Sequence, residues 1–205
     1  MPELINNALA RLETLLRYVA PGFVLLLLLM LLDPPLRTKA LNGNIPAWMV
    51  VLSAALAGVG LYSVHTGVIL RLVFWRAVVA LLIKCSPWLQ PSDRSKSARE
   101  VMFHLDTERW SRRASADREV VIIQGELDRW ASLVNFLYCS GYALIVAPLI
   151  ALERGSTSES HYWLVCLLGG LLLLVFACIS NYGMTDRALW AATKYPGGKT
   201  SDGSK

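Results

Sequence analysis

The sequence predicts an all-α integral membrane protein with four transmembrane helices, an amphipathic N-terminal helix and a cytoplasmic helical hairpin between spans 2 and 3. Apolar residues make up 55% of the 205 positions. They form blocks without Asp, Glu, Lys or Arg at residues 40–70, 130–152 and 160–185, with a shorter block at 18–32. About 20 helical residues cross a hydrocarbon core of roughly 30 Å, so these blocks are typical of membrane spans. Backbone groups in lipid must bond within the segment, which makes each span a helix.

The first element, residues 1–19, is predicted as an amphipathic helix because apolar side chains recur at intervals of three and four. These side chains are Ile5, Leu9, Leu12, Leu16 and Val19. Spans 1 and 2 are expected within residues 20–65. The leucine-rich body of span 1 is too short by itself, so the span must begin near Leu15, with Arg17 extending to the headgroups. Pro21-Gly22 should break or kink the helix there.

Residues 33–46 contain three prolines and a glycine, which predict a loop. Span 2 is expected from about Ala47 to His65, with Trp48 and Tyr62 near its two interfaces. Residues 66–129 should form a cytoplasmic helical region. In this region an apolar helical stretch should continue to the prolines at 87 and 91, and a polar helix should follow at 92–114.

Span 3 is predicted to extend out of the membrane as one continuous helix, because its apolar stripe begins in the polar region. The stripe consists of Val120, Ile123, Leu127, Trp130, Val134 and Leu137. Spans 3 and 4 are expected within residues 130–184. Residues 185–205, rich in Gly, Ser and Lys towards their end, should form a flexible cytoplasmic tail.

Lys and Arg predict that both termini are cytoplasmic. With that orientation 17 of the 20 basic residues lie inside, and only Arg37, Lys39 and Arg154 lie outside. The net charge of +5 is therefore explained by topology. The largest polar segment is nearly neutral, so no nucleic-acid partner is expected. Membrane lipid is the expected partner, and a bacterial inner membrane is the expected location.

Small residues in the spans predict close helix packing, since they let backbones approach in lipid. The candidate packing residues are Ala54 and Gly58 in span 2 and Gly170 in span 4. They could pack within one bundle or between the copies of a homo-oligomer. Both interpretations are compatible with the sequence.

Polar residues at the predicted cytoplasmic ends of three spans form a candidate vestibule for a ligand, ion or partner. They are His65, Asn135 and Asn181, with Tyr62, Tyr138 and Tyr182 nearby. Strongly polar groups within spans are often functional. The alternative is ordinary hydrogen bonding at the interface.

Arg109, Arg112 and Arg113 surround Trp110 and form a candidate site for anionic lipid; a solvated turn is the alternative. Glu100, His104 and Glu108 share one helical face with Arg112. That face suits solvated ion pairs, although a metal or pH-sensing role would need the same residue types.

No cofactor or metal is expected, because the four cysteines are scattered and no phosphate-binding or hydrolase motif occurs. The sequence favours a non-enzymatic multi-pass protein that acts by oligomerisation or by docking a cytoplasmic partner on its helices. Its layout is similar to that of small membrane components of bacterial anti-phage systems, and the resemblance covers layout only. A membrane-perturbing effector or pore is one alternative. A membrane-embedded enzyme or its accessory subunit is the other.

Overall fold

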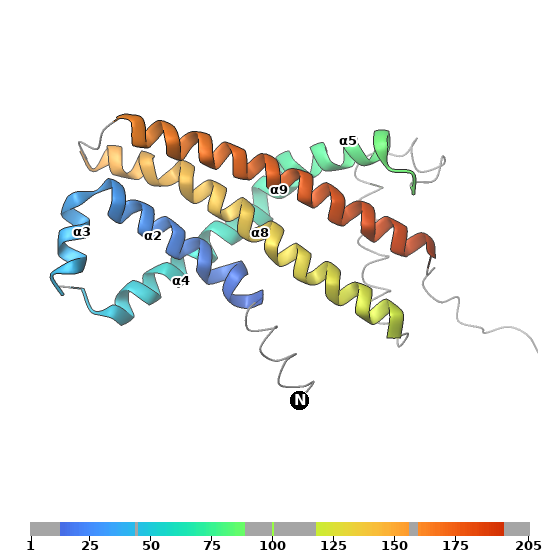
Figure 1. Cartoon of the computed structure of the whole chain (residues 1–205), viewed down its shortest axis with the longest axis horizontal. Helices are drawn as coiled ribbons and strands as arrows, with labels where there is room; N and C mark the ends of the chain where they lie inside the picture. Colours follow the sequence, from blue (N-terminus) through green and yellow to red (C-terminus); the bar gives the residue numbers. More distant parts are fainter. Residues whose placement is uncertain (1–12, 44, 89–99, 101–117, 156–159, 195–205) are drawn as a thin grey trace, which may run out of the picture. The chain divides into compact units, whose positions relative to one another are not determined.

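A computed structural model describes residues 13–43, 45–88, 100, 118–155 and 160–194 (Figure 1). Every regular element within these residues is a helix. In chain order the elements are η1 (Leu15–Val19), α2 (Ala20–Leu32), α3 (Pro34–Leu41), α4 (Ala47–Val64), η2 (His65–Phe74), α5 (Trp75–Cys85), α8 (Arg118–Glu153) and α9 (Ser160–Lys194).

Four helical segments are long and apolar enough to cross a membrane, which agrees with the prediction of an α-helical protein with four spans. They cover Leu15–Leu32, Ala47–Leu70, Glu119–Glu153 and Tyr162–Ala191. These segments are called spans 1 to 4 below. Many of their large side chains are exposed, including Leu27, Leu56, Leu168 and Phe176. Exposure of leucine and phenylalanine is costly in water and favourable in lipid.

Span 1 passes through Pro21 without interruption. The helix has π geometry over η1, where the Ala20 N–H donates to the Leu15 carbonyl, and α geometry from Ala20 onwards. π turns are inserted where the regular hydrogen-bond ladder is disturbed, and proline removes one donor from it. The predicted break is therefore a change of helical geometry inside a continuous span.

The loop predicted over residues 33–46 is wrong for its first part, because α3 occupies Pro34–Leu41. The Asp33 side chain caps this helix by accepting a hydrogen bond of 3.1 Å from the Leu36 N–H. Pro34 and Pro35 occupy its first turn, where proline costs no backbone hydrogen bond. An Asp followed by two prolines is a helix-start pattern, and that pattern outweighs the turn tendency of proline.

Helix α4 continues through the π segment η2 into α5, which ends at Cys85 immediately before extended backbone at Ser86. This agrees with the expected apolar helical stretch that stops near Pro87. The continuous helix predicted for span 3 is also confirmed, since α8 runs unbroken from Arg118 to Glu153. Along the predicted stripe, Val120, Leu127 and Val134 are buried.

Helix α9 extends to Lys194, so residues 185–194 are not part of a tail as predicted. One local and one long-range contact explain the extension. The Thr185 hydroxyl donates to the Asn181 carbonyl at 2.8 Å. Leu189 is buried in an apolar cluster with Val78, Val79 and Leu82. The predicted N-terminal helix before residue 13, the polar helix at 92–114 apart from Glu100, and the tail after 194 lie outside the described residues.

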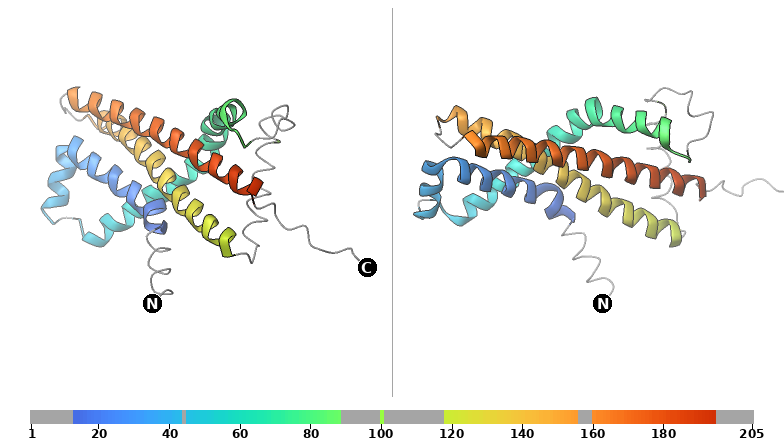
Figure 2. Two further views of the ribbon diagram at one scale, coloured as in Figure 1. Left: turned by 45° about the vertical axis from the view of Figure 1, so that its right-hand side comes forward. Right: turned by 45° about the horizontal axis from the view of Figure 1, so that its top comes forward.

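The chain divides into two compact units. The first unit comprises residues 1–70 and 132–177, and the second comprises 71–131 and 178–205. In the first unit α2 and α4 cross, and α8 packs beside α9 in antiparallel fashion (Figures 1 and 2). Its core contains Leu25, Leu32 and Cys166 against the small residues Ala143, Ala147 and Ala151.

Candidate functional site

Helix α8 carries a polar face towards spans 1 and 2 in the first unit. Side chains on one helical face recur at intervals of three and four. Ser132, Asn135, Cys139 and Tyr142 follow this spacing. Farther along α8, the face changes to Ala143, Ala147 and Ala151, all of which are fully buried. The same helix thus offers polar partners in one half and close backbone packing in the other.

His65 of span 2 is fully buried against the polar half of α8. Its Nδ1 lies 2.9 Å from the Tyr142 hydroxyl. Its ring stacks on Tyr138, with centroids 4.5 Å apart and planes inclined by 30°. Asn135 also interacts with the imidazole through its side chain, whereas Nε2 makes no well-formed hydrogen bond to the described residues. The imidazole is thus held by the Tyr142 hydroxyl, by the Asn135 side chain and by aromatic stacking.

Arg17 of η1 joins span 1 to the same face of α8. Its Nη2 donates to the Ser132 hydroxyl at 2.8 Å. Nearby, the rings of Tyr18 and Tyr62 meet edge to face with centroids 4.7 Å apart. Tyr62 also interacts electrostatically with Arg17. We expected Arg17 to extend to the headgroups. At least one of its donors instead bonds within the bundle, as buried polar groups require.

The structure describes the residues of the predicted vestibule in two separate units. His65 and Asn135 come together in the first unit, whereas Asn181 belongs to the second. Asn181 is buried there, and Tyr182 packs beside the cluster of Val78, Val79 and Leu82.

The small residues of span 2 pack against span 1 of the same chain. A Cβ on Gly58 would collide with the Tyr18 carbonyl, and one on Gly22 would collide with the Ala54 carbonyl. Gly60 has open space at the corresponding position. Ala54 and Gly58 therefore serve packing within the bundle. The Pro21-Gly22 pair predicts a helix break from the sequence. In the structure Gly22 lies at the crossing of spans 1 and 2.

Gly170 also packs within the chain. A Cβ built on it would lie 2.9 Å from the Gly141 carbonyl oxygen, and one on Gly141 would lie 3.1 Å from the Gly170 carbonyl oxygen. The two glycines thus allow α8 and α9 to approach closely in the first unit. Gly141 was missed, and its signal is the run of small residues that continues at Ala143, Ala147 and Ala151 in the same helix.

The second unit has its own polar contacts. Ser86, just after α5, donates to the Asp186 carboxylate of α9. Trp130 Nε1 of α8 donates to the Ser180 hydroxyl at 2.8 Å, and the Trp130 indole lies against Gly183. These contacts connect α5, the first part of α8 and the last part of α9. The candidate lipid-binding residues Arg109, Arg112 and Arg113 lie outside the described residues.

Comparisons of this chain with protein-family models, curated proteins and solved structures find no match.

Proposed function

We propose that this chain is a non-enzymatic multi-pass protein of a bacterial inner membrane, with both termini cytoplasmic, that docks a cytoplasmic protein partner on the second unit. The observation that supports this proposal is the length of its helices. Helices α8 and α9 contain 36 and 35 residues. Each is therefore about 50 Å long, while about 20 residues suffice to cross the hydrocarbon core. The surplus turns of both helices belong to the second unit.

The second unit is held together by its own apolar cluster and by side-chain hydrogen bonds. Its surface is therefore formed before a partner binds. A preformed surface loses little conformational entropy when a partner binds. On its α8 segment, Val121 and Ile122 are 54% and 53% exposed, whereas the neighbouring Val120 is buried. With residues 130–152 of α8 in the hydrocarbon core, as the sequence predicts, these two apolar side chains lie outside the lipid. Exposed apolar side chains mark a contact site when they belong to a larger patch, and a docked partner would cover this pair.

The small-residue faces that favoured a homo-oligomer are filled by other helices of the same chain. Ala54 and Gly58 pack on span 1, and Gly170 packs on Gly141. Self-association therefore receives no support from these faces. It stays a prediction, and the exposed pair on α8 offers the better candidate contact for any partner.

Photo-cross-linking in cells tests the docking proposal. A benzophenone amino acid replaces Ile122, and the control carries it at Leu172 of α9, which is similarly exposed but lies deep in span 4. We expect one discrete protein adduct from position 122 and none from position 172. An adduct of twice the chain mass would identify a second copy instead. Absence of a protein adduct at position 122, or the same adduct at both positions, would contradict docking at this surface.

The proposed orientation is tested separately by labelling with a membrane-impermeant maleimide. Cys85 is exposed and should be protected in intact cells but labelled after the membrane is opened. In a Cys85→Ser background, Asn42→Cys should be labelled in intact cells. The opposite pattern would reverse the topology. Ion flux through proteoliposomes containing the purified chain would favour the pore alternative.

A further inference from the structure

The end of α9 combines one aromatic ring with two basic side chains. The Arg187 guanidinium carbon lies 3.8 Å from the centre of the Trp190 ring, and Lys194 Nζ lies 5.2 Å from it. Arg187 and Lys194 are both exposed, and Trp190 is partly buried. A tryptophan ring attracts cations through its negative face, so Trp190 holds both charges on one side of the helix.

The position of these side chains on α9 places them at a membrane surface. Span 4 covers Tyr162–Ala191, and its 20 residues from Leu164 to Gly183 are already enough to cross the hydrocarbon core. Arg187, Trp190 and Lys194 follow Gly183 by four, seven and eleven residues, which corresponds to roughly 6, 10 and 16 Å along the helix. The headgroup layer on each side of the core is on the order of 5–7 Å thick.

Side-chain direction brings the charges closer to the lipid than these distances suggest. Side chains of an α-helix lean towards its N-terminus, and in α9 that direction is towards the membrane. The contact of Lys194 with Trp190, one turn earlier, follows this direction. Tryptophan is enriched where an apolar and a polar medium meet. The acidic neighbour Asp186 is engaged by Ser86.

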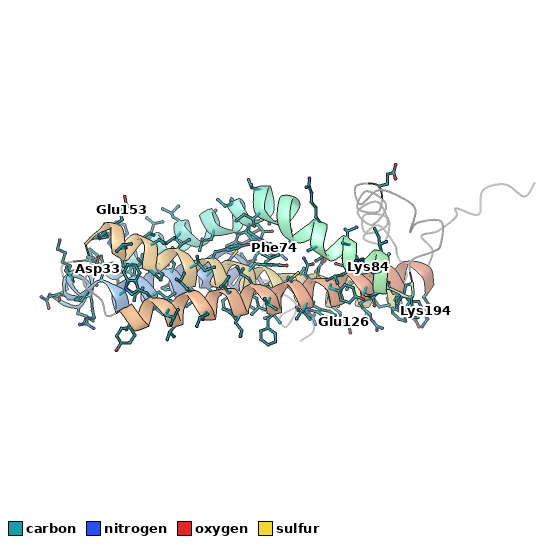
Figure 3. All side chains as sticks on the ribbon, turned by 90° about the horizontal axis from the view of Figure 1, so that it is seen from above. Asp33, Phe74, Lys84, Glu126, Glu153 and Lys194 are labelled. Atoms are coloured by element: carbon teal, nitrogen blue, oxygen red, sulfur yellow. The ribbon has the colours of Figure 1, made fainter. Side chains whose placement is uncertain are left out.

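A third positive charge lies at the same end of the second unit. Lys84, in the last turn of α5, is exposed. Figure 3 shows Lys84 and Lys194 at this end, and the bond between Ser86 and Asp186 joins the end of α5 to α9 near Arg187. Lys194 also complements the partial negative charge at the C-terminus of α9, which is a structural role. A direct measurement of bound lipid distinguishes this structural role from lipid binding.

We propose that Arg187, Trp190 and Lys194 form a binding site for the headgroup of an anionic phospholipid of the adjacent leaflet. The site needs only that α9 crosses the membrane, and it is independent of partner docking on α8. Each basic residue near an anionic surface contributes about a fivefold gain in affinity. Loss of both charges should therefore weaken lipid binding by roughly ten- to thirtyfold.

Native mass spectrometry of the full chain in detergent tests this site, with phosphatidylglycerol as the probe and phosphatidylcholine as the neutral reference. The unmodified chain should bind phosphatidylglycerol more tightly. Arg187→Gln with Lys194→Gln should lose most of that preference, while Arg187→Lys with Lys194→Arg should keep it. The matched control is Arg37→Gln with Lys39→Gln, two exposed charges on α3, and it should bind within about twofold of the unmodified chain.

Three outcomes would overturn the proposal. The double glutamine variant could retain the preference for phosphatidylglycerol, or the α3 control could lose it equally. The third is displacement of bound lipid by millimolar inorganic phosphate, which would identify a site for the free anion. All the substituted side chains are exposed, so helix content measured by circular dichroism should stay unchanged in each variant and confirm that it is folded.

Discussion

The Arg154 Nε and Asp33 Oδ2 atoms lie 2.9 Å apart and form an ion pair between the turn after span 1 and the turn after span 3. Asp33 is buried and Arg154 is 53% exposed at its side chain. Figure 3 shows Asp33 and Glu153, the neighbour of Arg154, at the same end of the first unit. Asp33 also caps α3, so one carboxylate begins a helix and connects two spans.

Because Asp33 is the buried partner, removal of Arg154 should cost more than neutralisation of Asp33. Arg154→Ala leaves a buried carboxylate without its counter-ion and should lower the free energy of unfolding by about 2–3 kcal/mol. Asp33→Asn keeps a capping oxygen and should cost about 1 kcal/mol or less. In the Asp33→Asn background, Arg154→Ala should have almost no further effect. Denaturant unfolding in detergent measures all four proteins, and additive costs would show that the pair is not coupled.

Substitution of Gly58 should damage the crossing of spans 1 and 2, whereas Gly60 should tolerate the same change. The added methyl group of Gly58→Ala meets the Tyr18 carbonyl, and the one of Gly60→Ala meets open space. We expect a loss of about 2 kcal/mol or more for Gly58→Ala from overpacking, and a gain of up to about 1 kcal/mol for Gly60→Ala. Thermal unfolding in detergent decides, and equal effects would refute the packing described for Ala54 and Gly58.

The hydroxyl of Tyr142 should stabilise the buried His65. Tyr142→Phe removes the hydroxyl that lies 2.9 Å from His65 Nδ1. The buried ring nitrogen then loses this hydrogen bond. The expected cost is about 1–3 kcal/mol. Tyr162→Phe is the control, because Tyr162 is exposed at the start of span 4, and it should change stability by less than about 0.5 kcal/mol. A similar stability for both variants would show that the His65 contact is energetically unimportant.

Two adjacent leucines test whether the second unit has a packed core. Leu82 is fully buried with Val78, Val79 and Leu189, whereas Leu81 is 42% exposed. Leu82→Ala should cost about 2–5 kcal/mol because it leaves a cavity. Leu81→Ala should cost about 1 kcal/mol or less. Proteolysis at α5 reports opening of this unit, and rapid cleavage of the Leu81 variant but not the Leu82 variant would contradict the assignment.

The number of long apolar helices can be predicted from composition, because the thickness of a bilayer sets a minimum length for each of them. The extension of α8 before residue 130 can be predicted too, since the periodicity of Val120, Leu127 and Val134 is local. Helix α3 is encoded too, in Asp33 and the two prolines that follow it, although prolines also predict a loop. Local patterns of this kind depend on residues within a few turns of each other.

The helix faces that meet become visible only in the folded chain. Gly58 and Gly60 are the same residue type and lie in the same span, yet Gly58 faces the Tyr18 carbonyl and Gly60 faces open space. Asn135 reaches His65 through its side chain, a contact that hydropathy does not reveal. Lipid tails solvate any apolar face equally well, so hydropathy carries no information about rotation of a helix around its axis. That rotation is set by close contacts between residues far apart in the chain, such as Gly22 with Ala54 and Arg17 with Ser132.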